Sequence, residues 1–217
     1  IADDFNPRFI NNMNEISFAS NRRNDTIFSP GTGPEKNTTT AFSIYVYNLK
    51  SKSKVLRKIS EGSYINHVQP LYRGNEHYLY LSDKNGIYNQ YLAEYDSAIA
   101  FIDTTIHYRY FANSSPLTNY SRNILNHDYN KTTKDVANII YHDGKHHLYK
   151  YPADLMDAKV EILENTEYRQ RHVDRLQRED SMQNVIQRVV SMQEILNNEL
   201  IVDDDTIILP EFRIDIN

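Results

Sequence analysis

Histidine is the residue type in this sequence with the clearest capacity for chemistry, because imidazole can bind a metal or exchange a proton near neutral pH. Four of the eight histidines fall within 21 positions: His127, His142, His146 and His147. A metal site needs three or four converging ligands, and neighbours in a strand, such as His146 and His147, point to opposite faces. At most one of these two could join His127 or His142. We therefore predict no metal site and no cofactor here, and interpret these residues as solvated hairpin histidines.

Other catalytic patterns are missing from the sequence. The chain has no cysteine, so it has no thiolate nucleophile and no disulfide framework. It also has no Gly-x-Ser-x-Gly nucleophile elbow. Asp203–Asp205 lacks the spaced loop of a calcium site, and we interpret it as a solvated acidic linker. The sequence predicts no catalytic residues, and we expect a protein that is not an enzyme.

Composition narrows the classes of partner. The chain has 217 residues, a net charge of −5 and a pI near 5.9, whereas a general nucleic-acid binder normally carries a basic stripe. No apolar run approaches the roughly 20 residues of a membrane-spanning helix. We therefore expect no nucleic-acid partner and no direct membrane span. Ile1–Phe5 has no Met, basic region or apolar segment, so we expect an excised or mature segment with any signal peptide outside it.

The elements that would position any site are repeated β-hairpins. The clearest is Tyr78–Asp96, in which Tyr78–Ser82 and Ile87–Ala93 are rich in residues that favour strands. Between them, Asn85-Gly86 predicts a type I′ turn, and Asp143-Gly144 predicts a second one later in the chain. An extended entry, a polar turn and a hairpin recur with a period of about 55 residues, in units near residues 4–61, 62–120 and 121–154. The sequence therefore predicts a mainly β fold.

The entry segments and one longer stretch support this repeat. His67–Tyr72 matches the entry Asn6–Phe9, since both place a polar residue before a proline and an aromatic residue after it. Ala98–Phe111 is predicted to be extended chain, with alternating polar and apolar residues over Ile106–Phe111.

The last third of the chain differs in character. Residues 164–199 contain no Gly and no Pro, and strong helix formers dominate. We predict a helical extension within residues 155–200, followed by an acidic linker or short strands over residues 201–217. Asp180–Gln183 resembles a capping box, so the region is either one helix or two helices hinged near Asp180. Five apolar residues at 3-4-3-4 spacing form the helix stripe, which we predict to bind either a partner or the rest of this chain: Met182, Val185, Val189, Met192 and Leu196.

These repeats resemble the WD40-like repeats of TolB-like β-propellers. In that pattern, an entry Pro-x-aromatic leads to an apolar strand ending in Ser-Asp/Asn-Arg, and Ile-Tyr-x-x-Asp-Leu follows. Similar segments occur over roughly residues 4–151: Pro7–Ile10, Glu15–Arg22 and Ile44–Leu49 in the first unit, and Leu79–Asp83 and Ile87–Leu92 in the second. Pro116–Leu125 also resembles large TolB-like proteins of the Bacteroidetes cell envelope.

The resemblance implies a partial β-propeller of about three blades with a C-terminal α-helical extension. The family's Ser-Pro-Asp-Gly turn is absent from all three units, being Ile10–Asn14 in the first. Three blades are also fewer than the 4–8 that typically close a propeller. We therefore expect a fragment whose partners are the remainder of the same propeller or proteins of the cell envelope.

Two functions follow as expectations from the resemblance. The first is a non-catalytic scaffold for protein–protein interactions, periplasmic or associated with the outer membrane. The alternative is a propeller enzyme or glycan-binding protein, with a lyase-like metal site on the propeller axis. His67 and His107 are the histidines to test for that alternative, since both lie near strands of the second unit.

Overall fold

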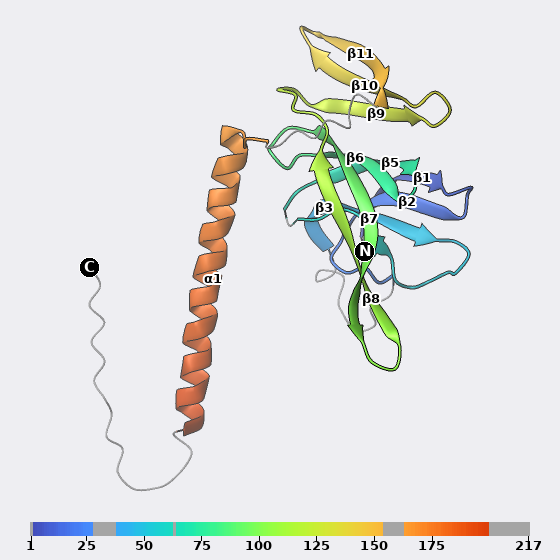
Figure 1. Cartoon of the computed structure of the whole chain (residues 1–217). Helices are drawn as coiled ribbons and strands as arrows, with labels where there is room; N and C mark the ends of the chain where they lie inside the picture. The colour runs from blue at the N-terminus through green and yellow to red at the C-terminus, as the bar shows by residue number, and fades with distance from the viewer. Residues whose placement is uncertain (1, 28–37, 63, 154–162, 200–217) are drawn as a thin grey trace, which may run out of the picture. The chain divides into compact units, whose positions relative to one another are not determined.

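The computed structural model describes residues 2–27, 38–62, 64–153 and 163–199 (Figure 1). The chain divides into two compact units, Ile1–Arg169 and Gln170–Asn217. The described part of the first unit is built from three antiparallel sheets, and that of the second is helical. The predicted mainly β fold is therefore confirmed. The sheets do not close into a propeller within the described residues.

Each sheet is an antiparallel meander of strands that follow one another in the sequence. The first contains β1 Asp4–Ile10, β2 Glu15–Arg22, β3 Thr38–Asn48 and β4 Arg57–Lys58. The second contains β5 His67–Gly74, β6 His77–Ser82, β7 Asn89–Ile102 and β8 Ile106–Pro116. The third contains β9 Ile124–Asn130, β10 Asp135–His142 and β11 Lys145–Pro152. One sheet thus falls in each repeat unit of the sequence.

The entry strands share a β-bulge. The residue before the proline has a positive φ in both cases, 52° at Asn6 and 54° at Gln69, and the pairing register shifts at that point. Proline lacks the N–H that a strand ladder requires, so bulges are where a strand accommodates it. In the third sheet the register shifts beside Leu125 without a proline. The match between the two entry segments in the sequence is a match in backbone geometry.

The registers also match the positions on the two faces of each sheet. When the pairing registers of the three sheets are compared, Phe9 of the first sheet, Tyr72 of the second and Tyr129 of the third occupy the same position. We call the face that carries them the aromatic face. Four further positions on this face are equivalent in the three sheets. They are Ile16, Phe18, Tyr45 and Tyr47 in the first sheet; Tyr78, Tyr80, Tyr91 and Ala93 in the second; and Val136, Asn138, Tyr149 and Tyr151 in the third.

The opposite face carries smaller and aliphatic residues, and we call it the aliphatic face. Its matched positions are as follows: Ser17, Ala19, Ile44 and Val46 in the first sheet; Leu79, Leu81, Gln90 and Leu92 in the second; Ala137, Ile139, Leu148 and Lys150 in the third.

The three sheets stack with the same orientation, so that the aliphatic face of one sheet packs on the aromatic face of the next. One buried cluster joins Ala19, Ile44 and Val46 of the first sheet's aliphatic face to Tyr78 and Tyr80 of the second sheet's aromatic face. A second cluster joins the second sheet's aliphatic face to the third sheet's aromatic face, through Leu79, Leu92, Val136 and Tyr151. Burial of this apolar surface is the main favourable contribution to the stack. Each interface pairs one aliphatic face with one aromatic face.

The predicted type I′ turn at Asn85-Gly86 is wrong. Ser82 pairs with Asn89, so six residues connect β6 to β7, and among them Gly86 alone has a positive φ, 94°. A type I′ turn needs positive φ at both central residues. Instead Asn85 is 3% exposed and its carbonyl accepts a hydrogen bond from the N–H of Thr166 at 2.9 Å. The dipeptide is held by a distant segment of the chain.

The other predicted turn is confirmed. His142 pairs with Lys145, and the two residues between them, Asp143 and Gly144, have φ of 50° and 76°. Both central residues therefore have the positive φ of a type I′ hairpin.

Helix α1 runs without a break over the 33 residues Glu167–Glu199, which decides for one helix over two. Thr166 caps it, because its Oγ1 accepts a hydrogen bond from the N–H of Arg169 at 3.2 Å. The predicted capping box near Asp180 is wrong, since Ser181 Oγ donates back to the Gln177 carbonyl inside the helix. Residues 201–217, with Asp203–Asp205, lie outside the described residues. Among the described residues, no helix is long and apolar enough to cross a membrane.

Candidate functional site

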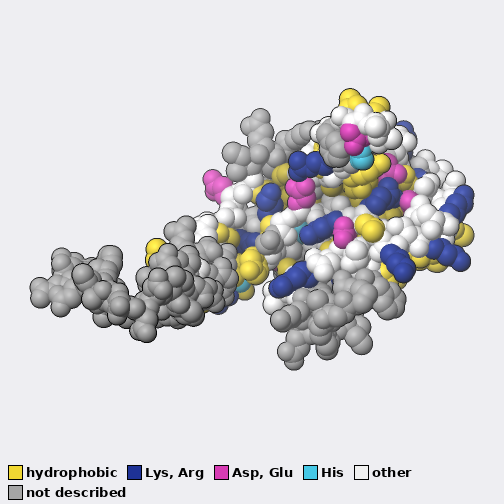
Figure 2. Space-filling model, turned by 90° about the horizontal axis from the view of Figure 1, so that it is seen from below, with side chains coloured by type: hydrophobic (Ala, Val, Ile, Leu, Met, Phe, Trp, Pro, Cys, Tyr) yellow, Lys and Arg dark blue, Asp and Glu magenta, His cyan; other side chains and the backbone are white. Residues whose placement is uncertain are grey.

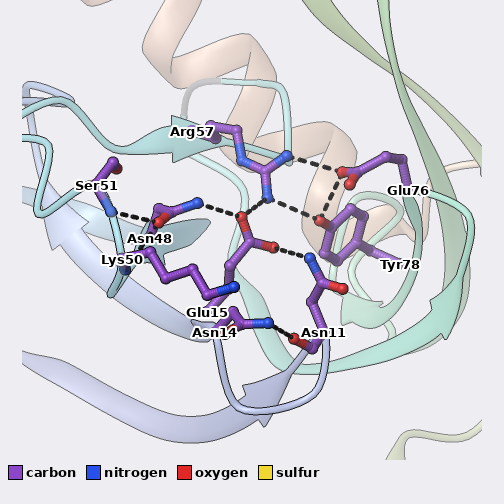
Figure 3. A network of polar contacts seen from close by, with 9 residues as sticks. All are labelled: Asn11, Asn14, Glu15, Asn48, Lys50, Ser51, Arg57, Glu76 and Tyr78. Carbon is purple, nitrogen blue, oxygen red and sulfur yellow. Dashed lines mark hydrogen bonds and ion pairs between the residues drawn. The ribbon is translucent and has the colours of Figure 1, made fainter.

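A polar clamp joins the first sheet to the second (Figure 3). Arg57 of β4 places its guanidinium 2.8 Å from a carboxylate oxygen of Glu15 on β2 and 2.8 Å from one of Glu76, in the turn between β5 and β6. The Tyr78 hydroxyl donates to Glu76 at 2.9 Å. We call these four residues the polar clamp. Asn48 and Asn11 donate to the two Glu15 oxygens at 3.1 and 3.4 Å.

The electrostatics of the clamp fix its protonation. Burial alone would lower the pKa of Arg57, but Tyr78, Glu76 and Glu15 raise it above its ordinary value. Burial also raises the pKa of Tyr78, which Arg57 only partly opposes. The clamp thus holds a cationic guanidinium and a neutral phenol. Because one guanidinium pairs with both carboxylates across two sheets, we interpret the clamp as structural.

Two buried histidines lie in the second and third sheets. His127 is 2% exposed; its Nε2–H donates to the Gln69 carbonyl at 2.7 Å, and its Nδ1 accepts from Gln90 Nε2 at 2.9 Å. His67 is also 2% exposed and donates to the Glu61 carbonyl at 3.0 Å. Burial lowers the pKa of each imidazole to about 4. Both rings are therefore neutral at pH 7. The interpretation of His127 as a solvated histidine is wrong, because the ring is buried and joins the third sheet to the second.

The remaining histidines do not gather around one point. His107 is exposed near the start of β8, 3.2 Å from Asp103, whereas His67 is buried. His142 and His147 stack with ring centroids 3.7 Å apart, while His146 lies on the other face of β11 and packs against Tyr141. Within the described ranges, no group of three or more His, Asp or Glu side chains is placed to hold a metal.

Strands β7 and β8 continue past the sheet as a two-stranded arm, defined as residues 96–111 (Figure 1). β6 pairs with β7 only over residues 89–94, whereas β8 pairs with β7 as far as Ile102 and Ile106. Every described side chain over residues 96–110 is exposed. Four of them are large and apolar, with exposed fractions of 50% to 67%: Ile99, Ile102, Ile106 and Tyr110. Exposed apolar side chains that gather on one element mark interaction surfaces.

The arm is ordered at both ends. At its tip, an Asp103 carboxylate oxygen accepts a hydrogen bond from the Thr105 N–H at 2.8 Å, and this bond lowers the pKa of Asp103. At its base, Tyr110 stacks on Tyr95 with centroids 6.0 Å apart, and Arg57 of the polar clamp lies 5.2 Å from the Tyr95 ring. Figure 2 views the molecule from the side to which the arm points in Figure 1, and hydrophobic side chains there lie among charged ones.

The sequence did not predict the arm as a separate element. Ala98–Phe111 was expected to be extended chain, which agrees with the strands, but no Gly or Pro marks the turn between them. The signal present was Asp103 followed by two threonines, since an Asp side chain can close a turn on the backbone two residues later.

The predicted partner-binding residues lie on α1. Met182, Val189 and Met192 are 68%, 54% and 66% exposed. The side chains of Val185 and Leu196 lie outside the described residues. Residues three and four apart share one face of a helix, so the described members of the stripe form an exposed apolar row.

A hollow of about 450 Å³ is lined by residues of the second and third sheets. Its lining combines charged and polar side chains, among them Arg73, His77, Glu94 and Lys134, with the apolar Leu92, Leu117 and Tyr129. Ligand pockets combine apolar and polar side chains in this way.

No protein-family model matches the chain, and no curated protein matches it.

Proposed function

We propose that the chain is part of a TolB-like β-propeller that acts as a non-catalytic scaffold for protein–protein interactions. The observation that carries the proposal is the arm, a two-stranded element with four large apolar side chains at 50% to 67% exposure. An isolated hairpin is marginally stable in water, so such an element gains from a protein surface to pack on. Its open strand edges also suit pairing with an added strand.

The propeller part of the proposal is supported by the repeated stack. Three meanders use the same two faces in the same order, as blades of a propeller do when each contacts only its neighbours. Three blades are too few for a ring, so the remainder of the propeller comes from outside this segment. The location in the bacterial envelope rests on the resemblance of the repeats.

The helix stripe is the second docking element in this proposal. Met182, Val189 and Met192 present an exposed apolar row, which suits a helix-binding groove. The arm and the stripe are then two separate contacts of one scaffold.

A pull-down with matched variants tests the proposal. The immobilised chain is incubated with an envelope extract of a Bacteroidetes-type bacterium, and bound proteins are quantified by mass spectrometry. We expect the arm variant I102S/I106S to lose one set of proteins and the stripe variant M182S/M192S to lose another, each by roughly tenfold or more. The control V55S removes an apolar side chain of similar exposure, 55%, outside both elements. Recovery of no protein, or equal loss with V55S, contradicts the scaffold role.

The hollow supports a second candidate, binding of an acidic glycan. Arg73 and Lys134 contribute cationic side chains to its lining, which suit carboxylates, whereas His77 lies 3.5 Å from the carboxylate of Glu94. Titration calorimetry with a polyuronate tests this candidate, with R73A/K134A as the variant. Binding that is absent, or unchanged in the variant, removes it.

A further inference from the structure

Part of the aromatic face of the first sheet, around Phe9, is more exposed than its counterparts, whereas Tyr45 on the same face is 1% exposed and its counterpart Tyr149 is 43% exposed. Phe9 is 68% exposed, whereas Tyr72 packs into the cluster between the first and second sheets, and Tyr129 into the cluster between the second and third. Ile16 and Phe18 are half-buried, whereas Tyr78 and Tyr80, at the same positions in the second sheet, are 0% and 1% exposed. No other sheet of the described residues covers this face.

The aliphatic face of the third sheet shows the same difference at the other end of the stack. Leu148 is 72% exposed, whereas the matched Ile44 and Gln90 are both 0% exposed. Ile139 is half-buried, whereas Ala19 and Leu81 are at most 1% exposed. The stack thus ends in two unlike faces, and they are the two kinds that pack against each other twice inside the chain.

We infer that the chain self-associates head to tail, with the third sheet's aliphatic face of one copy packed on the first sheet's aromatic face of a second copy. The occupant is argued from continuity with the two interfaces in the chain, which both join an aliphatic to an aromatic face. One chain cannot satisfy both of its own faces, since Phe9 and Leu148 stay exposed together.

The symmetry of the assembly follows from the chemistry of the faces. The two faces differ, so the contact is heterologous and generates a ring or an open chain of copies rather than a two-fold dimer. This inference goes beyond the proposed function, in which further blades would cover the same two faces: it assigns both faces to a second copy and needs no envelope partner. A chain that remains monomeric would leave the pull-down result on the arm intact.

Two single substitutions test the contact, one on each face. F9D and L148D both replace side chains that are at least 68% exposed in the monomer, so each variant keeps its fold but would bury an unpaired carboxylate in the contact. Sedimentation velocity of the full chain over a wide concentration range is the measurement. We expect the unmodified chain to form larger species as concentration rises, and each variant alone to be monomeric, with association weakened by roughly a hundredfold or more.

The mixture of the two variants decides the geometry. F9D retains an intact third sheet and L148D an intact first sheet, so an equimolar mixture forms a heterodimer and stops there. The control I102D introduces the same charge at a side chain that is 67% exposed on the arm, and it should associate like the unmodified chain. The inference is overturned by a chain that is monomeric at every concentration, by F9D or L148D associating normally, by a mixture that stays monomeric, or by loss of association in I102D.

Discussion

Arg57 holds its guanidinium 2.8 Å from the carboxylate of Glu15, a side chain that is only 6% exposed. A carboxylate at this depth depends on its cation, because removing one partner of a buried pair leaves an uncompensated charge. The same guanidinium reaches Glu76 of the second sheet. The interface between the first two sheets therefore rests on this polar clamp as well as on its apolar cluster.

Replacing Arg57 with Met should lower the free energy of unfolding by about 2–4 kcal/mol, since Glu15 loses its cation while staying buried. The double variant E15Q/R57M should recover part of this loss, because a neutral amide costs less to bury than a carboxylate. Urea unfolding followed by fluorescence or circular dichroism measures both values.

The matched control is K150M. Lys150 also lies 2.8 Å from a carboxylate, that of Asp135, but its side chain is 68% exposed. Exposed pairs contribute at most about 1 kcal/mol. If K150M were as destabilising as R57M, burial would not be the source of the effect.

The two buried histidines should make the fold sensitive to acid. Their pKa is about 4 in the folded chain against 6.5 for an ordinary histidine, so the unfolded chain takes up protons first as pH falls. Stability from these groups is complete above about pH 6.5, decreases between pH 6.5 and pH 4, and is fully lost below pH 4. A shift of about 2.5 pKa units corresponds to about 3 kcal/mol for each ring.

Comparing H127Q with the unmodified chain at pH 7 and pH 4.5 separates the contribution of His127 to the pH dependence of stability from that of the carboxylates. The variant should lose about 2 kcal/mol less than the unmodified chain over that interval. H107Q is the control, because His107 is exposed near the start of β8. An equal pH dependence for H127Q and the unmodified chain would falsify the assignment of a neutral buried imidazole.

Gly86 and Gly144 provide a matched pair of glycines that tests how closely Thr166 packs on the loop at Gly86. Both have positive φ, 94° and 76°, so alanine is strained at either site by about 1–2 kcal/mol. A Cβ at Gly86 would also overlap Thr166 and meet Arg169, whereas nothing lies within 4 Å of one at Gly144. G86A should therefore cost about 2–4 kcal/mol and G144A about half of that. Thermal unfolding measures both, and equal losses would contradict the packing of Thr166 on this loop.

The fold was predictable where local chemistry specifies it. Strand composition and the Asn6-Pro7 and Gln69-Pro70 entries predicted one sheet in each unit, and the bulges at those prolines explain why the pattern was readable. Asp143-Gly144 formed the expected turn, and among the described residues nothing lies within 4 Å of a Cβ at Gly144. Asn85-Gly86 did not, because Thr166, 81 residues after Asn85, donates its N–H to the Asn85 carbonyl. Contacts over such separations leave no local signal.

The candidate sites were less predictable for the same reason. Glu15, Arg57 and Glu76 belong to no motif, and only the stacking of two sheets brings them together. The sequence did indicate the stripe on α1, since helical spacing is a local property. Its role as a partner-binding site stays a prediction.

Removing the arm should leave the fold intact. Residues 98–109 can be replaced by Asn-Gly, which closes the pair Ser97 and Tyr110 with a two-residue turn and keeps Tyr110 on Tyr95. The free energy of unfolding should change by less than about 1 kcal/mol, because the described side chains of the removed segment are exposed. The shortened chain should at the same time lose the proteins that I102S/I106S loses in the pull-down. A loss of stability above about 2 kcal/mol would mean that the arm packs on the fold and serves it as structure, and the interaction role would then lose its main support.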